Sequence, residues 1–145
     1  MVSNPPDQYS QLEQQIRTIA SGIRTAWSKI GSFKVLDENL APEGLKPIAR
    51  SISWLIDQIT VQNLRRYHDE IGFERIDDPP HGLTQYDCVI KLFGDTRSYY
   101  LNVKTSLTIT GRGGRFDISK APRLIKMYRQ NPDLVLLVAI IKLDI

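Results

Sequence analysis

The 145-residue chain predicts an α/β fold with a mixed sheet, in the order helix, helix, strand, strand, strand, helix, strand. Two observations predict it. Up to residue 71, apolar residues recur at steps of three and four, as they do on one face of a helix. After Gly72, short apolar segments alternate with turns rich in glycine and proline, as strands do. We therefore expect a single domain over 1–145, with an N-terminal helix and loop over 1–45 and an α/β core over 46–145.

Two amphipathic helices are expected in the first half of the chain. The first runs from Asp7 to Ile30, and Gly31 closes it. The second runs from about Pro47 to Ile71, after a loop that contains two prolines and a glycine. The apolar stripe of the first helix, over residues 12–30, is expected to be a core partner or a dimer surface.

Four strands and a third helix are expected in the second half. In chain order they cover residues 73–76, 86–93, 98–107, 119–131 (the helix) and 134–141. The tetrapeptide at 94–97 is typical of a hairpin turn, so the second and third strands should pair. The third helix should turn Ala121, Leu124, Ile125 and Tyr128 inward, because they recur at helical spacing. The last strand is apolar throughout, as expected of a strand covered on both faces.

Composition excludes several classes of protein. Cys88 is the one cysteine, so the chain has neither a disulfide framework nor a cysteine-rich zinc site. The N-terminal residues do not read as a signal peptide, and the longest apolar run is too short to span a bilayer, so a cytoplasmic location without membrane contact is expected. A P-loop and the motifs of acyl-transfer enzymes are also missing from the sequence.

Polar residues on two neighbouring strands suggest a site that acts on phosphate. Side chains alternate along a strand, so Asn102 and Lys104 share one face. If the hairpin forms, Asp87 on the preceding strand lies near that face. A carboxylate there would hold Mg²⁺, which prefers oxygen ligands. The lysine would hold a scissile phosphate or help to deprotonate the attacking water.

The pattern of Asp87, then 14 residues, then Asn102-Val103-Lys104 resembles the PD-(D/E)xK nuclease superfamily, to which type II restriction endonucleases belong. The resemblance covers roughly residues 47–145 and implies a restriction-endonuclease-like α-β-β-β-α-β core with a mixed sheet. It also implies a Mg²⁺-dependent endodeoxyribonuclease. Asp87 and Asn102 would bind the metal with help from the carbonyl of Val103, and Lys104 would be catalytic. Some members add an acid from the preceding helix, for which Asp57 is the candidate.

The sequence departs from the family pattern at two positions. Tyr86 replaces the proline before the first acid, and Asn102 replaces the second acid. An amide oxygen can bind Mg²⁺ but brings no charge, so metal affinity should fall. Three accounts remain open: a natural variant compensated by Asp57, an engineered inactivating substitution, or a degenerate domain. Glu70 is an alternative to Asp57, and Asp77 and Asp78 are alternatives to Asp87, although they read as turn residues.

Basic residues gather in the second half of the chain. Residues 1–80 carry 9 basic against 11 acidic side chains, whereas residues 81–145 carry 10 against 5. This asymmetry suits an anionic partner, and double-stranded DNA is expected. The candidate DNA-binding residues are Arg112, Arg115, Lys120 and Arg123. A homodimer is expected, because a two-fold enzyme can cut both strands. The alternatives are a catalytically inactive nuclease fold that binds DNA or serves assembly, and a protein-interaction domain.

Overall fold

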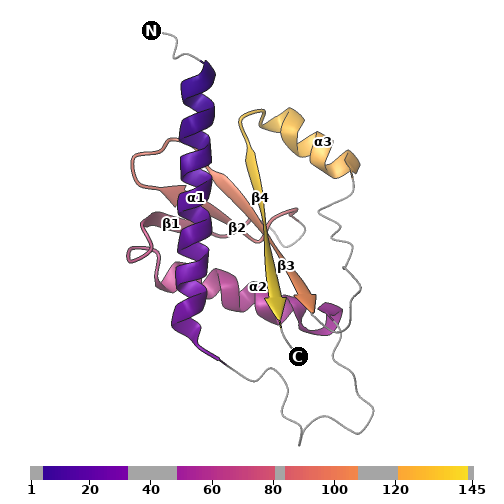
Figure 1. Ribbon diagram of the computed structural model, residues 1–145. Helices are drawn as coiled ribbons and strands as arrows, with labels where there is room; N and C mark the ends of the chain where they lie inside the picture. Colours follow the sequence, from indigo (N-terminus) through magenta and orange to yellow (C-terminus); the bar gives the residue numbers. More distant parts are fainter. Residues whose placement is uncertain (1–4, 33–48, 81–83, 108–120, 144–145) are drawn as a thin grey trace, which may run out of the picture.

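The computed structural model describes residues 5–32, 49–80, 84–107 and 121–143 (Figure 1). Within them the chain forms the mixed α/β architecture that the sequence predicts, with a helix first. The elements are α1 (Pro5–Ile30), α2 (Ala49–Arg66), β1 (Phe73–Asp77), β2 (Cys88–Leu92), β3 (Tyr99–Leu107), α3 (Ala121–Gln130) and β4 (Val135–Leu143).

The four strands form one mixed sheet in the order β1-β2-β3-β4. β2 pairs antiparallel with both β1 and β3, which confirms the predicted hairpin, and β3 pairs parallel with β4 along nine residues. Parallel neighbours need a crossover connection, and α3 lies within the one between β3 and β4. The antiparallel pairing of β2 with β3 is the one that the sequence predicts, and it brings residue 87 close to residues 102–104.

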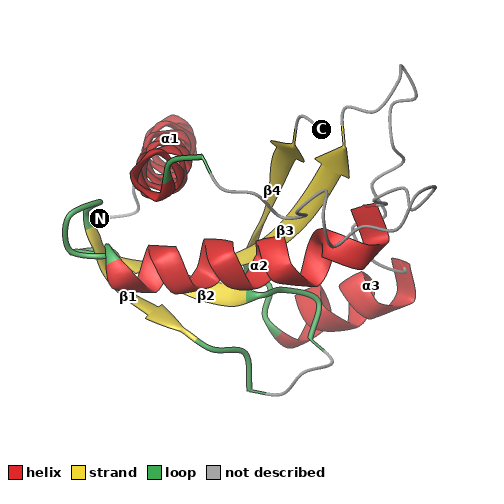
Figure 2. Cartoon of the chain, turned by 90° about the horizontal axis from the view of Figure 1, so that it is seen from below, coloured by secondary structure: helices red, strands yellow, loops and turns green. Residues whose placement is uncertain are grey.

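The core lies where α1, the second half of α2 and the sheet meet. Figure 1 shows α1 in front of the sheet and α2 crossing beneath it, and Figure 2 shows the two helices from below. Ile19, Ile23 and Ala26 of α1 are buried in this core, so the apolar stripe of α1 is in large part a core partner. Gly22 allows the close approach: a Cβ atom there would lie 2.5 Å from Cζ of Phe73.

Helix α2 ends at Arg66, five residues before the expected end at Ile71. Residues 67–72 form turns instead, and the amide of Phe73 donates to the carbonyl of His68. Gly72 has a φ of +79°, a conformation that glycine adopts at little cost, and it is the last residue of the turns before β1. The apolar Tyr67 and Ile71 pack as helical residues would, which is why their spacing extended the predicted helix.

Two expectations about the last third of the chain are wrong. The predicted inner face of α3 is largely exposed, with Ile125 at 51% and Tyr128 at 41% of full exposure, and no residue of α3 is buried. Strand β4 is not covered on both faces, because Ile140 is 45% exposed. Among the strands that the structure describes, β4 pairs only with β3 and is therefore an edge strand.

Two further features are the burial of the cysteine and the character of the helices. Cys88 is fully buried at the start of β2, and this burial raises the pKa of its thiol to about 12. In the described part of the chain, every helix is too short or too polar to cross a membrane.

Candidate active site between helix α2 and strands β2 and β3

Asp87 lies directly before β2 and is fixed by the backbone of β3. Its amide donates to the carbonyl of Leu101 at 2.7 Å, and its carboxylate oxygen Oδ2 accepts from the amide of Val103 at 2.6 Å. The hairpin register, which pairs Cys88 with Leu101, produces both contacts. The expectation that Asp87 lies against residues 102–104 is therefore confirmed.

Asp57 of α2, which is not part of the sheet, lies near Asp87 and Lys104. Its pKa is raised to about 6, first by burial and then by the negative charge of Asp87, while the ammonium of Lys104 opposes the shift. The Oδ1 atom of Asp57 is buried without a hydrogen-bond partner in the described structure. The acid that interrupts the apolar face of α2 is thus a neighbour of the strand residues, as the sequence suggested.

Lys104 lies near both carboxylates. Its side chain is half-buried on β3, and its charge lowers the pKa of both Asp57 and Asp87. For Asp87, burial is the larger effect, and its pKa is raised overall even though the amide of Val103 and Lys104 both oppose the rise. Helix α2, the loop before β2 and strand β3 therefore bring two carboxylates and one ammonium together, and the pKa of each carboxylate is raised.

Asn102 has a structural partner that the sequence did not reveal. Its side chain is only 6% exposed, and Nδ2 donates to the backbone carbonyl of Gln85 at 2.6 Å. A carboxylate could not donate this hydrogen bond, so the loop before Asp87 is tied to β3 by the amide itself. The other amide atom, Oδ1, is buried and lacks a hydrogen-bond partner among the described residues.

These atoms suit a divalent cation that prefers oxygen ligands. The buried Oδ1 atoms of Asp57 and Asn102 have no partner within the described ranges, and Asp87 retains Oδ1 beside the Oδ2 atom that accepts from Val103. Mg²⁺ binds through one or two carboxylates and keeps several waters, so this donor set can hold it. The charge at the site is low, however, because no cluster of three His, Cys, Asp or Glu side chains occurs in the part of the chain that the structure describes.

The alternative acids lie elsewhere in ion pairs. Glu70 accepts from Lys29 of α1, Asp77 accepts from Arg75, and Asp78 accepts from Arg65 at 2.6 Å. Each of these exposed acids thus has a basic partner. The structure therefore favours Asp57 over Glu70 as the helix acid.

The structure describes one of the four candidate DNA-binding residues. Arg112, Arg115 and Lys120 lie outside the described residues, so their positions relative to Lys104 stay predictions. Arg123 is exposed in the first turn of α3.

Sequence reasoning overlooked an aromatic pair beside the acids. The rings of Tyr86 and Tyr100 meet edge to face with their centroids 4.8 Å apart, next to Asp87 and two residues before Asn102. Burial raises the pKa of Tyr86. The presence of tyrosine before Asp87 and at the start of β3 was visible in the sequence, but their contact follows only from the strand register.

Comparisons with known proteins found no relative of this chain. No protein-family model matches the chain, and the searches of curated proteins and of solved structures gave no match either.

Proposed function

We propose that this protein is a Mg²⁺-dependent endodeoxyribonuclease of the restriction-enzyme type with a PD-(D/E)xK-like site. The observation that supports this most is the convergence of Asp57, Asp87 and Lys104 from α2, the loop before β2, and β3. Two carboxylates whose pKa values are raised by burial, beside a lysine, indicate a functional site rather than a surface ion pair.

Each residue has a distinct role in this proposal. Asp57, Asp87 and the amide oxygen of Asn102 would hold the metal, together with the carbonyl of Val103. A bound Mg²⁺ supplies positive charge for the developing phosphorane oxygens and a source of activated water. The ammonium of Lys104, near enough to influence both carboxylates, would bind a non-bridging phosphate oxygen. Because Val103 holds one oxygen of Asp87, the direction of this carboxylate is set before substrate arrives.

Binding of duplex DNA would rest on basic residues that follow β3 in the chain. Arg112, Arg115, Lys120 and Arg123 contribute to the excess of ten basic over five acidic residues in residues 81–145. Phosphate contacts of this kind position a protein on DNA without reading sequence. A homodimer acting in the cytoplasm, with one site for each strand, completes the proposal.

A catalytically inactive nuclease fold that binds DNA or serves assembly is the second candidate. The observation that favours it is the hydrogen bond from Asn102 to Gln85, because it gives the amide a structural role independent of metal. With two carboxylates in place of three acidic ligands, metal would bind weakly.

Cleavage of a supercoiled plasmid separates the two candidates. We expect cutting with Mg²⁺ or Mn²⁺, none with EDTA, and none by Lys104→Ala in either condition. Lys142→Ala is the matched control, because Lys142 lies exposed on the neighbouring strand β4. Metal-independent DNA binding without any cutting by the wild type would favour the inactive fold, whereas cutting by folded Lys104→Ala would place the active site elsewhere.

A further inference from the structure

An apolar groove lies between α1 and β4, and none of the candidate active-site residues lines it. Its volume is about 450 Å³. One wall is formed by apolar residues of α1 that recur at helical spacing, among them Ile16, Ile23 and Trp27. The other wall is formed by six consecutive residues, Leu137 to Lys142, of β4. Because consecutive residues of a strand point to opposite faces, a groove that touches all six runs along the edge of the strand.

Among the residues that the structure describes, no strand pairs with the edge of β4 opposite to β3. This edge extends over nine residues, with Lys142 as the one charged residue and with no proline. The pairing with β3 is in register along the whole strand, so no bulge twists this edge away. Natural edge strands are normally short, bulged or charged, because unpaired backbone groups invite a further strand.

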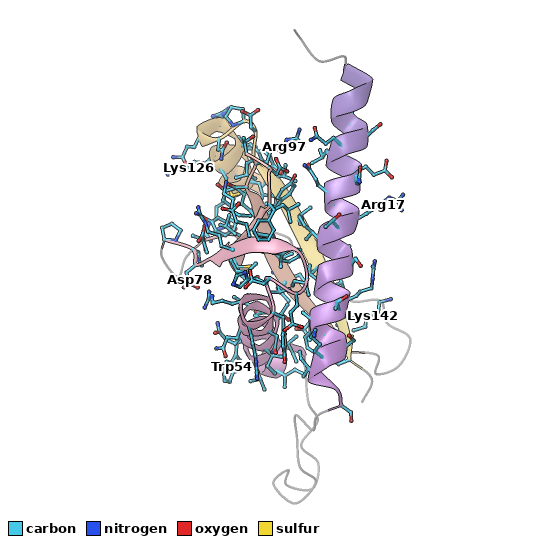
Figure 3. The ribbon with its side chains drawn as sticks, turned by 90° about the vertical axis from the view of Figure 1, so that its left-hand side faces the viewer. Arg17, Trp54, Asp78, Arg97, Lys126 and Lys142 are labelled. Carbon is cyan, nitrogen blue, oxygen red and sulfur yellow. The ribbon has the colours of Figure 1, made fainter. Side chains whose placement is uncertain are left out.

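Positive charge is confined to one end of the groove. Arg24 in the last quarter of α1 and Lys142 near the end of β4 are both exposed and both line it. Figure 1 shows α1 and β4 running in the same direction, so these two residues lie at the same end, and Figure 3 labels Lys142 beside the lower half of α1. The groove therefore offers apolar walls along its length and two cations at its end.

We propose that this groove binds an extended peptide segment of a partner protein, which adds a fifth strand to the edge of β4. Backbone groups of the peptide would pair with β4, alternate apolar side chains would enter the groove toward α1, and an acidic end would meet Arg24 and Lys142. An acyl chain with a carboxylate would match the walls and the charge, but it would leave the backbone of β4 unpaired. Because α1 bounds the groove on its far side, the opening suits a single strand better than a second copy of this domain. This inference does not rest on the proposed nuclease activity.

The probe is a short synthetic peptide of alternating valine and threonine that ends in glutamates. Amide hydrogen exchange is followed by NMR in the full chain. In the free protein, alternate amides of β4 should exchange fast, since they face the groove, while those paired with β3 are protected. The peptide should protect the fast set by at least about tenfold, which corresponds to roughly 1.4 kcal/mol. It should also shift the fluorescence of Trp27, observed in a Trp54→Phe background.

One pair of variants, with a charge reversal in reserve, tests the geometry. Ala139→Arg fills the groove, because Ala139 packs on the α1 side, whereas Ile125→Arg adds the same charge at an exposed position of α3 that does not line the groove. The first should weaken peptide binding about tenfold or more and the second by less than about twofold. If Ala139→Arg does not fold, Lys142→Glu serves instead, and it should shift preference toward a peptide that ends in lysines.

Four results would overturn the proposal. One is a peptide that leaves the exchange of every β4 amide unchanged. Another is equal binding of a control peptide with central prolines, which cannot pair along a strand. The third is protection of the same amides in the free protein that grows with protein concentration, since a second copy would then occupy the edge. Decanoate that shifts Trp27 while the peptide does not would likewise assign the groove to an acyl ligand.

Discussion

Replacing Asn102 by aspartate tests whether this position belongs to a metal site, and its effect can be worked out from two contacts. The substitution removes the Nδ2 donor that lies 2.6 Å from the carbonyl of Gln85 and puts a second acceptor in its place. It also introduces a carboxylate at a position that is 6% exposed, close to Asp87, whose pKa burial already raises. Both changes destabilise the metal-free protein.

The size of the destabilisation follows from these two effects. A buried polar group left without its partner costs about 1–3 kcal/mol, and repulsion from the neighbouring carboxylates adds to it. We therefore expect Asn102→Asp in EDTA at pH 8 to be less stable by about 2–4 kcal/mol, a fall in Tm on the order of 10 °C. The difference should shrink as the pH is lowered, because protonation of the new carboxylate removes its charge.

Metal should reverse the destabilisation if residue 102 is a ligand. A cation that binds only the folded state stabilises it by about 2.7 kcal/mol at 100 times its Kd, and a third carboxylate should lower that Kd. The assay is thermal melting of the wild type, Asn102→Asp and Asn102→Ala with EDTA and with Mg²⁺, beside a cleavage time course. Asn102→Ala removes the same hydrogen bond without adding charge, so metal should not rescue it. An aspartate variant that melts like the wild type in EDTA and ignores Mg²⁺ would refute this reasoning and the assignment of a metal site to residue 102.

Three other predictions concern the site, the core and DNA. The pKa of Asp57 is raised from 3.8 to about 6, so the folded state holds a proton that the unfolded state releases, and stability should fall as the pH rises from about 4 to about 6. Urea unfolding of Asp57→Asn should therefore show a gain of about 1–2 kcal/mol at pH 8, allowing for solvent screening, and little gain near pH 4. Gly22→Ala should cost about 1–3 kcal/mol by the same assay, because its Cβ would clash with the buried ring of Phe73, and a neutral result would mean that α1 can move aside. DNA affinity should fall steeply as the salt concentration rises. The double variant Arg112→Ala, Arg115→Ala should reduce the slope of log affinity against log salt concentration by about 0.9 for each phosphate that it no longer neutralises. DNA binding that does not depend on salt would mean that these basic residues only face solvent.

The parts of the site that the sequence predicted depend on regular structure. The pairing of β2 with β3 follows from the turn at 94–97, and strand alternation then places Asp87 against the 102–104 segment. Asp57 was identifiable because a charged residue on the apolar face of a helix must find a partner or a polar environment. Both inferences use local patterns, namely turn residues and the spacing of apolar side chains, which a single sequence displays.

The parts that it did not predict depend on tertiary partners. The hydrogen bond from Asn102 to the carbonyl of Gln85 requires the path of the loop at 84–87, which no repeat in the sequence fixes. The exposure of Ile125 and Ile140 was also unforeseen, because an apolar pattern shows which face avoids water but not what covers it. The mixed α/β class was therefore predictable, whereas the open edge of β4 was not.

The buried thiol of Cys88 has a practical consequence for labelling. A maleimide reacts with the thiolate, and a side chain with a pKa of about 12 and no exposure to solvent presents almost none at neutral pH. The native chain therefore already serves as a background without reactive cysteine, and the core position need not be mutated. A cysteine introduced at the exposed positions of Trp54 or Lys142 should accept a single fluorophore in the folded protein, while Cys88 reacts only after unfolding. The distance between two such dyes would then report on the approach of α2 and β4 when DNA binds.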